Sequence, residues 1–122
     1  MPKTEYPFHH IGIPTTEPKP GERYMQDVKV HVTGFDANEF GIEWLRFEPG
    51  TPMPELVQKL AHVAFKVENL DEAIEGRKTI FGPHVSGDGV RFVYIESEGA
   101  PVELIEISSR RGYVFVGKSI TR

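Results

Sequence analysis

Two histidine–glutamate pairs recur along this chain in similar sequence contexts. His10 begins the run His-Ile-Gly-Ile, and His62 begins His-Val-Ala-Phe. Glu43 lies in Ile-Glu-Trp-Leu, and Glu103 lies in Val-Glu-Leu-Ile. Imidazole nitrogens and carboxylate oxygens bind divalent ions such as Zn, Ni, Co, Mn and Fe(II). The four residues therefore form a candidate site for one divalent metal per chain, with positions left open for water or substrate.

Each of these four residues is predicted to lie on a β-strand next to at least one apolar residue. Side chains alternate between the two faces of a strand, so the polar side chain points away from the apolar face. A single polar residue at such a position is usually just solvated. Four of them at repeated positions favour a shared site, provided that the two halves of the sheet curl toward each other.

Other polar and aromatic residues near these positions receive different interpretations. His9 adjoins His10, and a register slip of one residue would reverse the face, so His9 is an alternative ligand to His10. The remaining candidates are given other roles: His31 and His84 as surface or funnel-lining residues, Glu106 as a structural residue and Trp44 as a core residue.

The elements that must position the site alternate between strand-like and turn-like segments. Strands are predicted over residues 8–13, 28–32, 42–47, 60–67, 79–81, 90–96 and 102–107. Asn69 followed by Glu72 is a capping-box pattern, which predicts a helix over residues 70–77. Three prolines and a glycine exclude a regular helix from residues 14–21. The two halves thus share one plan, except that the first lacks the helix.

We expect a single domain over residues 1–122, built from two repeated modules. Module one covers about residues 8–49, a rigid proline-containing linker about 50–59, module two about 60–107 and an appended strand segment about 108–122. The appended strand itself is expected at Tyr113–Val116. An exposed apolar strand edge is a liability unless something covers it, so we expect a homodimer.

Composition narrows the classes of function. Of 122 residues, 39% are hydrophobic and 26% are charged, which is typical of a globular domain. A net charge of −4 does not suit nucleic-acid binding, and the absence of cysteine excludes thiolate metal sites and cysteine nucleophiles. There is no apolar run of roughly twenty residues and no apolar signal-peptide core. We expect a cytoplasmic protein with a small-molecule partner, not a nucleic acid or a membrane.

Over about residues 8–107 the sequence resembles the vicinal oxygen chelate superfamily, which includes glyoxalase I, methylmalonyl-CoA epimerase, fosfomycin- and bleomycin-resistance proteins and extradiol dioxygenases. The likeness is strongest in the second module, in Ala-His-Val-Ala-Phe-Lys-Val, the capped helix and Pro-Val-Glu-Leu-Ile-Glu-Ile. The resemblance implies an α+β fold in which two βαβββ modules form a cup-shaped mixed sheet, here with the helix of the first module shortened. It also implies one metal ligand from the first and one from the last strand of each module: His10, Glu43, His62 and Glu103.

The resemblance further implies a glyoxalase-like lyase or isomerase that acts on a small substrate with vicinal oxygens through a metal-stabilised enolate. Glu43 and Glu103 are then also the candidates for proton transfer. The alternative is a metal-free small-molecule-binding protein of the same fold, like the bleomycin-resistance type. The four-residue ligand set favours the enzyme, and the shortened first module slightly favours the binding protein. As a ligand, Glu103 should be replaceable by Gln without destabilising the metal-free protein, because clustered carboxylates repel.

Overall fold

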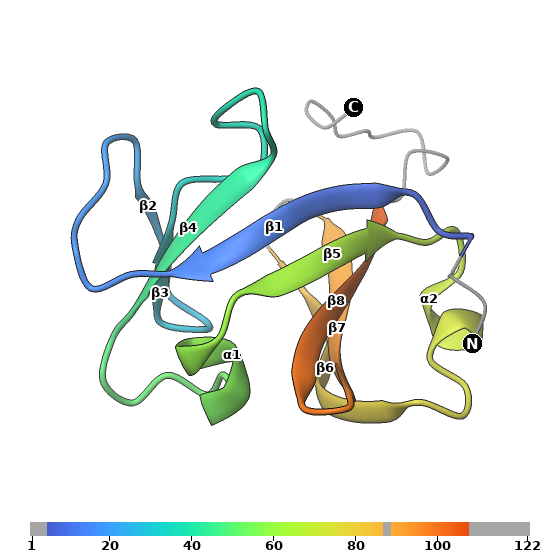
Figure 1. The fold of residues 1–122 in the computed structure, drawn as a ribbon. Helices are drawn as coiled ribbons and strands as arrows, with labels where there is room; N and C mark the ends of the chain where they lie inside the picture. Colours follow the sequence, from blue (N-terminus) through green and yellow to red (C-terminus); the bar gives the residue numbers. More distant parts are fainter. Residues whose placement is uncertain (1–4, 87–88, 108–122) are drawn as a thin grey trace.

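The computed structural model describes residues 5–86 and 89–107, which form one eight-stranded sheet and two short helices (Figure 1). The strands are β1 (Phe8–Pro14), β2 (Arg23–Met25), β3 (Val30–Val32), β4 (Ile42–Phe47), β5 (His62–Lys66), β6 (Lys78–Val85), β7 (Val90–Ser97) and β8 (Ala100–Ile107). The helices are α1 (Glu55–Lys59) and α2 (Leu70–Ala73). Neither helix in this part of the chain is long and apolar enough to cross a membrane.

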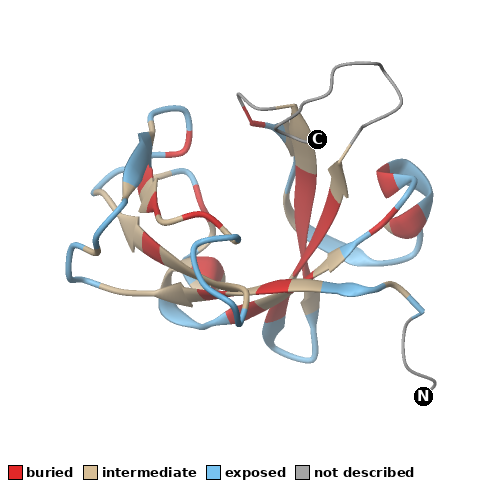
Figure 2. Ribbon diagram, turned by 90° about the horizontal axis from the view of Figure 1, so that it is seen from above, coloured by how far each residue is buried: buried red, intermediate tan, exposed pale blue. Residues whose placement is uncertain are grey.

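The strand order β2-β3-β4-β1-β5-β8-β7-β6 shows the repeat directly. In each half the first strand pairs in parallel with the last, β1 with β4 and β5 with β8. The halves are joined by the antiparallel pair β1–β5, which crosses the middle of the molecule (Figure 1). The two ends of the sheet rise on either side of this pair (Figure 2). The predicted cup-shaped mixed sheet is confirmed, and the first module has no helix between β1 and β2.

Two hydrophobic clusters lie on opposite faces of the sheet. The inner cluster joins both modules and α1 inside the cup: Val28, Val30, Val32, Leu45, Met53, Val57, Phe92, Tyr94 and Ile105. The outer cluster belongs to module two and packs α2 against the strands: Val67, Leu70, Ala73, Val93, Ile95 and Leu104. Figure 2 shows the buried residues of α2 facing those of the neighbouring strands. The sheet of module two is therefore covered on both faces, and that of module one mainly on its inner face.

The helix predicted from the capping box forms, but it is shorter than expected. The Asn69 side chain accepts a hydrogen bond from the backbone N–H of Glu72 at 3.1 Å, as an N-cap residue does. The α-helical segment ends at Ala73, and Gly76 has a φ of +74°. That left-handed conformation stops helical continuation, so the chain turns and begins β6 at Lys78 instead of extending the helix to residue 77.

Several boundaries differ from those predicted. The linker expected to be rigid contains α1, in which Val57 is buried and belongs to the inner cluster. β6 continues to Val85, well beyond residues 79–81. Gly82 and Pro83 lie inside this strand, where its pairing with β7 is irregular. Val28 precedes β3 as a buried turn residue, and the short strand β2, absent from the prediction, pairs with β3. The strand expected at Tyr113–Val116 lies outside the described residues.

Trp44 is not a core residue. Along β4 the inner face carries Leu45 and Phe47, so Trp44 points outward and is only half-buried. The ammonium group of Lys19, from the proline-rich segment, lies 4.4 Å from the centre of the indole ring. In module one the apolar core lies inside the cup, on the face of Leu45 and Phe47, so Trp44 is left on the opposite face.

Candidate metal centre

The antiparallel pair of β1 and β5 positions both histidines. His10 lies opposite Ala64, and Gly12 lies opposite His62. Each imidazole therefore stands over the small residue of the other module. Both histidines are 2% exposed, which places them at the bottom of the cup.

Gly12 makes room for His62. A Cβ atom added at Gly12 would lie 2.1 Å from Cε1 and 2.4 Å from Nε2 of His62, well inside van der Waals contact. The imidazole thus occupies the space above the glycine. A glycine inside a strand is the usual signal of such a close approach.

The last strand of each module supplies a carboxylate at the same register. Glu43 lies opposite Gly12, and Glu103 lies opposite Ala64. Glu103 Oε1 is 3.2 Å from His10 Nε2 and 3.1 Å from His62 Nε2. Glu43 Oε1 is 3.4 Å from His10 Nε2. The structure thus gathers all four residues singled out from the sequence into one connected cluster.

The cluster has the donors and the spacing that a metal ion needs. One ligand atom from each of His10, His62 and Glu103 lies within 4.8 Å of the others. His10 Nε2 is buried and has no partner in hydrogen-bonding geometry. A cation among these atoms would satisfy that nitrogen, and a set of imidazole nitrogen and carboxylate oxygen suits Zn, Fe(II), Co, Ni or Mn. Glu43, beside His10, is placed to be a fourth donor.

A bulge in β1 separates the roles of His9 and His10. The pairing with β5 shifts by one residue between Phe8 and His10. His9 Nδ1 then lies 2.8 Å from His10 Nδ1, on the side of the ring away from the carboxylates. Burial and the neighbouring His10 lower the pKa of His9 to about 4, so His9 is a neutral ring that can accept a hydrogen bond. A proton on His10 Nδ1 donated to His9 leaves the His10 Nε2 lone pair for a metal.

The two carboxylates differ in their proton affinity. Burial raises the pKa of Glu43 to about 7, and the charge of Glu103 adds to this increase. Burial also acts to raise the pKa of Glu103, but the nearby imidazoles of His10 and His62 outweigh it and lower that pKa to about 2. For His10, burial lowers the pKa, yet Glu103 and Glu43 outweigh it and the net change is upward. At neutral pH, Glu103 is the ionised partner and Glu43 the group that can exchange a proton.

Two aromatic residues that sequence analysis did not single out hold the histidines. The Tyr94 hydroxyl is 3.5 Å from His62 Nε2, and burial together with the charge of Glu103 raises the pKa of Tyr94 well above its usual value. Tyr94 is therefore a neutral phenol at the site. The ring of Phe35 stacks on His10 with centroids 5.4 Å apart. Aromatic residues have no spacing rule that would have revealed either contact.

A cleft opens over the cluster. Its polar lining residues include His10, Glu43 and Glu103 at the bottom and Arg23 on β2. The remaining walls are mainly apolar: Met25, Val28, Val30, Val32, Leu45, Met53, Val90, Phe92 and Ile105. A mainly apolar cleft with a few polar groups at its bottom is the usual form of a small-molecule site.

The other polar candidates lie away from the cluster. His31 Nε2 is 2.7 Å from Glu48 Oε2 and stacks near Tyr24 on the outer side of β3. Glu106 accepts a hydrogen bond from the backbone N–H of Leu70 at 3.1 Å and also pairs with Arg91. Glu106 therefore anchors the start of α2, in agreement with its interpretation as a structural residue. A separate pair joins His84 to Asp27 at the surface.

Comparisons with known proteins identify the fold. No family model matches the chain, and no curated protein matches it. Among solved structures, a hypothetical protein from Bacillus halodurans C-125 is 18% identical, with a TM-score of 0.67 over 86% of this chain and 96% of that one. Methylmalonyl-CoA epimerase from Mycobacterium tuberculosis is 14% identical, with a TM-score of 0.62 over 92% and 96%. A glyoxalase family protein from Bacillus cereus is 17% identical over 85% and 95%, with a TM-score of 0.36.

The epimerase match covers nearly the whole of both chains, and the repeated strand order agrees with the arrangement expected from the sequence. At these identities the likeness concerns the fold, and the chemistry must be argued from the residues of this chain. On that evidence, the chain has the cup-shaped fold of the vicinal oxygen chelate superfamily.

Proposed function

We propose that this protein is a divalent-metal-dependent isomerase or lyase that acts on a small substrate with two neighbouring oxygens. The observation that supports the proposal most is the buried cluster in which His10, His62 and Glu103 offer ligand atoms within 4.8 Å of one another. The cluster lies at the bottom of an apolar cleft, where burying polar groups is costly unless they are hydrogen-bonded, paired or bound to a metal. The fold shared with an epimerase agrees with this class of reaction.

His10, His62 and Glu103 would hold the ion, with Glu43 as a fourth donor or as the group that moves a proton. When bound, a divalent ion supplies Lewis-acid stabilisation of negative charge on a substrate oxygen. Glu43 is suited to proton transfer because its pKa of about 7 lets it both accept and release a proton near neutral pH. Tyr94 and Phe35 keep the imidazoles in place.

The second candidate is a metal-free binding protein of the same fold. It is favoured by the pairing of Glu103 with both histidines, because the cluster already balances much of its own charge. The mainly apolar walls of the cleft also suit simple sequestration of a ligand. Metal content separates the two candidates.

The test is metal analysis of protein purified without an affinity tag, followed by equilibrium dialysis against Zn, Ni, Co, Mn and Fe(II). We expect about one ion per chain, and a large loss of affinity in His10→Ala. His31→Ala is the matched control, because it removes a histidine paired with Glu48 outside the cluster and should leave metal binding unchanged. Binding should weaken from pH 7 to pH 4.5, since a proton on His10 competes with the ion. Equal metal content in wild type and His10→Ala would contradict the enzyme proposal.

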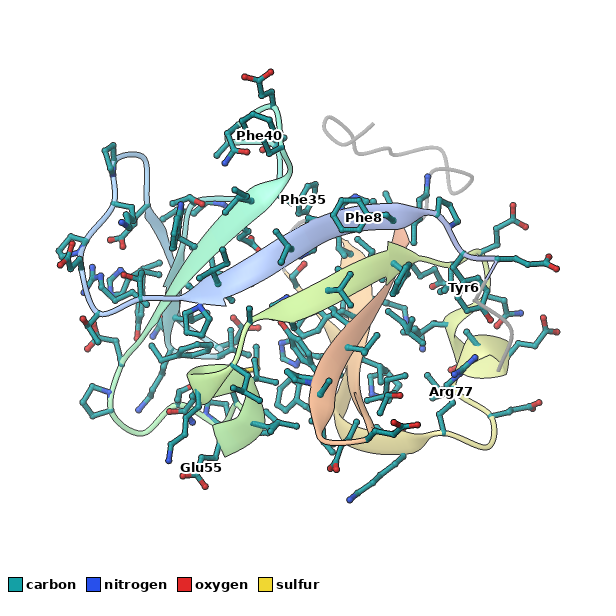
Figure 3. The ribbon with its side chains drawn as sticks, in the orientation of Figure 1. Tyr6, Phe8, Phe35, Phe40, Glu55 and Arg77 are labelled. Atoms are coloured by element: carbon teal, nitrogen blue, oxygen red, sulfur yellow. The ribbon has the colours of Figure 1, made fainter. Side chains whose placement is uncertain are left out.

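We also propose a homodimer that buries the outer face of module one. Ile11 lies opposite both Ile42 and Val63 there, and no helix covers this row in the described residues. The rings of Phe8 and Phe40 are more than half exposed on the same half of the molecule (Figure 3). Light scattering at tens of micromolar should give twice the chain mass; a monomer would contradict this proposal.

A cytoplasmic location stays a prediction.

A further inference from the structure

The two ends of the sheet are joined by a contact between side chains. Asp27 lies in the turn between β2 and β3, at one end of the strand order, and His84 lies on β6 at the other end. Nε2 of His84 is 2.5 Å from Oδ2 of Asp27, and the imidazole N–H donates to the carboxylate. Among the described strands, no backbone pairing joins β2 to β6. The Asp27–His84 pair therefore links two edges that the backbone leaves apart.

This pair connects the two walls of the cleft. On the side of module one, Met25 and Val28 lie on either side of Asp27 along the chain, and both line the cleft. On the side of module two, His84 lies opposite Phe92 in the register of β6 and β7. The centroids of these two rings are 5.4 Å apart, and Phe92 also lines the cleft. The metal cluster lies at the bottom, where β1 and β5 cross between the two rising ends of the sheet (Figure 2).

The walls are closely packed in the structure. Val28 is fully buried and Phe92 is 5% exposed, and both belong to the inner cluster that joins the modules. The imidazole of His62, in the metal cluster, is buried as well. Close-packed side chains leave few gaps larger than a water molecule. Widening the cleft for an organic molecule therefore requires the walls to separate, and the partly exposed Asp27–His84 pair opposes that movement.

We propose that the Asp27–His84 pair is a latch of the cup. While the pair is formed, the two ends of the sheet stay together; when it breaks, they separate and admit an organic molecule to the cluster. A partly exposed pair contributes little free energy, because water competes for both partners, so it can break without unfolding the domain. The latch controls access to the cup and does not require a bound metal, so it goes beyond the proposed function.

The test measures access to His62 with diethyl pyrocarbonate, a small organic reagent that acylates imidazole. Metal-free protein is treated at neutral pH, and modification of each histidine is followed by mass spectrometry. In Asp27→Ala the rate at His62 should rise about fivefold, the effect of losing one exposed polar contact. Asp27→Asn, whose amide oxygen can still accept a hydrogen bond from His84, should give an intermediate rate. His31, which pairs with Glu48 outside the cluster, is the internal reference and should react at an unchanged rate.

Lys78→Ala is the matched control. The ammonium group of Lys78 on β6 is 3.0 Å from a carboxylate oxygen of Glu96 on β7. The variant therefore also removes a pair from β6, but one that lies within module two, and the rate at His62 should equal that of wild type. The free energy of unfolding of each variant is measured by chemical denaturation. An unchanged rate in Asp27→Ala, an equal rise in Lys78→Ala, or a rise no larger than the increase in the unfolded fraction overturns the latch.

A reversible cross-link tests the same contact in the opposite direction. The chain contains no cysteine, so Asp27→Cys combined with His84→Cys gives the protein two thiols and no others. A bis-methanethiosulfonate reagent with a short alkyl spacer bridges the thiols through disulfides, and a reductant later removes the bridge. His62 should react more slowly in the bridged protein than in wild type, and after reduction it should react as in Asp27→Ala.

The single variant Asp27→Cys, treated in the same way, is the control and should react alike before and after reduction. Equal rates at His62 with and without the bridge overturn the latch. Because these measurements use metal-free protein, their outcome is independent of whether Zn binds. Failure of the latch leaves the metal site unaffected, and failure of Zn binding leaves the latch as the entry to a metal-free cup.

Discussion

Module one, β1–β4, and module two, β5–β8, repeat the same strand pairing but differ in the surroundings of equivalent residues. Glu43 and Glu103 occupy the same register against the first strand of their modules. Glu103 contacts both histidines, whereas Glu43 contacts His10. Their pKa values are about 7 and about 2. Equivalent backbone positions have thus become chemically different, one an ionised anchor and the other a group able to exchange protons.

The outer faces of the modules differ as well. α2 covers the sheet of module two and brings Leu70 and Ala73 into the outer cluster. On module one, the segment between β1 and β2 contributes Lys19 over Trp44 but no helix. Since both carboxylates remain in place, the inner site does not need the outer helix. The helix in module two serves stability, and its absence in module one leaves the outer face there without a covering helix.

The largest expected effect separates the two outer faces. Leu70 is fully buried, so Leu70→Ala should lower the free energy of unfolding by roughly 2–5 kcal/mol. Ile42 is half-buried on the uncovered face, and Ile42→Ala should cost less than about 1 kcal/mol in the monomer. Chemical denaturation at low protein concentration measures both. A comparable loss for Ile42→Ala would mean that this face is covered even in the monomer.

The second effect concerns Glu103. Its folded-state pKa of about 2 lies below its ordinary value of 4.5, so its ionised form contributes stability above pH 4.5 that is lost as the pH falls toward 2. Glu103→Gln should therefore weaken metal binding about tenfold or more and also destabilise the metal-free protein by about 3 kcal/mol at pH 7. The structure reverses the expectation drawn from the sequence that the metal-free variant loses no stability, because Glu103 pairs with both histidines.

Thermal unfolding of the metal-free Glu103→Gln variant checks this reversal. Glu106→Gln is a useful comparison, since Glu106 lies on the same strand but binds Leu70 and Arg91 outside the cluster. It should lower stability and leave metal affinity unchanged. A Glu103→Gln protein that melts at or above the wild-type temperature would show that repulsion among carboxylates dominates the empty site.

The third effect has the opposite sign and depends on pH. The folded-state pKa of Glu43, about 7, lies above the ordinary 4.5, so its neutral form contributes stability that is present below pH 4.5 and is lost as the pH rises through 7. Metal-free Glu43→Gln should equal wild type near pH 4.5 and be more stable by roughly 3 kcal/mol at pH 8. The quantity to measure is the difference in stability between the two proteins at each pH. The lowered pKa of His9 makes both proteins more stable as the pH rises, and this shared trend cancels in the difference. A difference that does not change with pH would contradict the raised pKa.

Much of this arrangement could be predicted from the sequence because alternation and repetition are local signals. The strand periods placed Glu43 and Glu103 away from their neighbours, and the capping box located the start of α2 at Asn69. What could not be predicted depends on contacts between distant segments. Whether the apolar side of a strand faces a helix or the inside of the cup is such a contact, and it decided the position of Trp44.

The difference between the pKa values of the two carboxylates also could not be predicted from the sequence. The contexts of Glu43 and Glu103 look alike, and only the side-chain packing at the bottom of the cup distinguishes them. Tyr94, which contacts His62, was not identified from the sequence for the same reason. The choice between His9 and His10 depends on the bulge in β1, and no residue type in the sequence predicts that bulge.

The smallest effect tests the one asymmetry between the small residues under the histidines. Ala64 in module two has a Cβ atom under His10, whereas Gly12 in module one has none, because His62 fills that space. Gly12→Ala should therefore push the His62 imidazole aside, lowering stability by roughly 1–2 kcal/mol and weakening metal binding. In a His62→Ala background the same substitution should cost almost nothing, because the clash is gone. Unfolding of the four proteins of this cycle gives the coupling directly. An equal cost in both backgrounds would place the effect in the backbone of β1 and remove Gly12 from the account of the site.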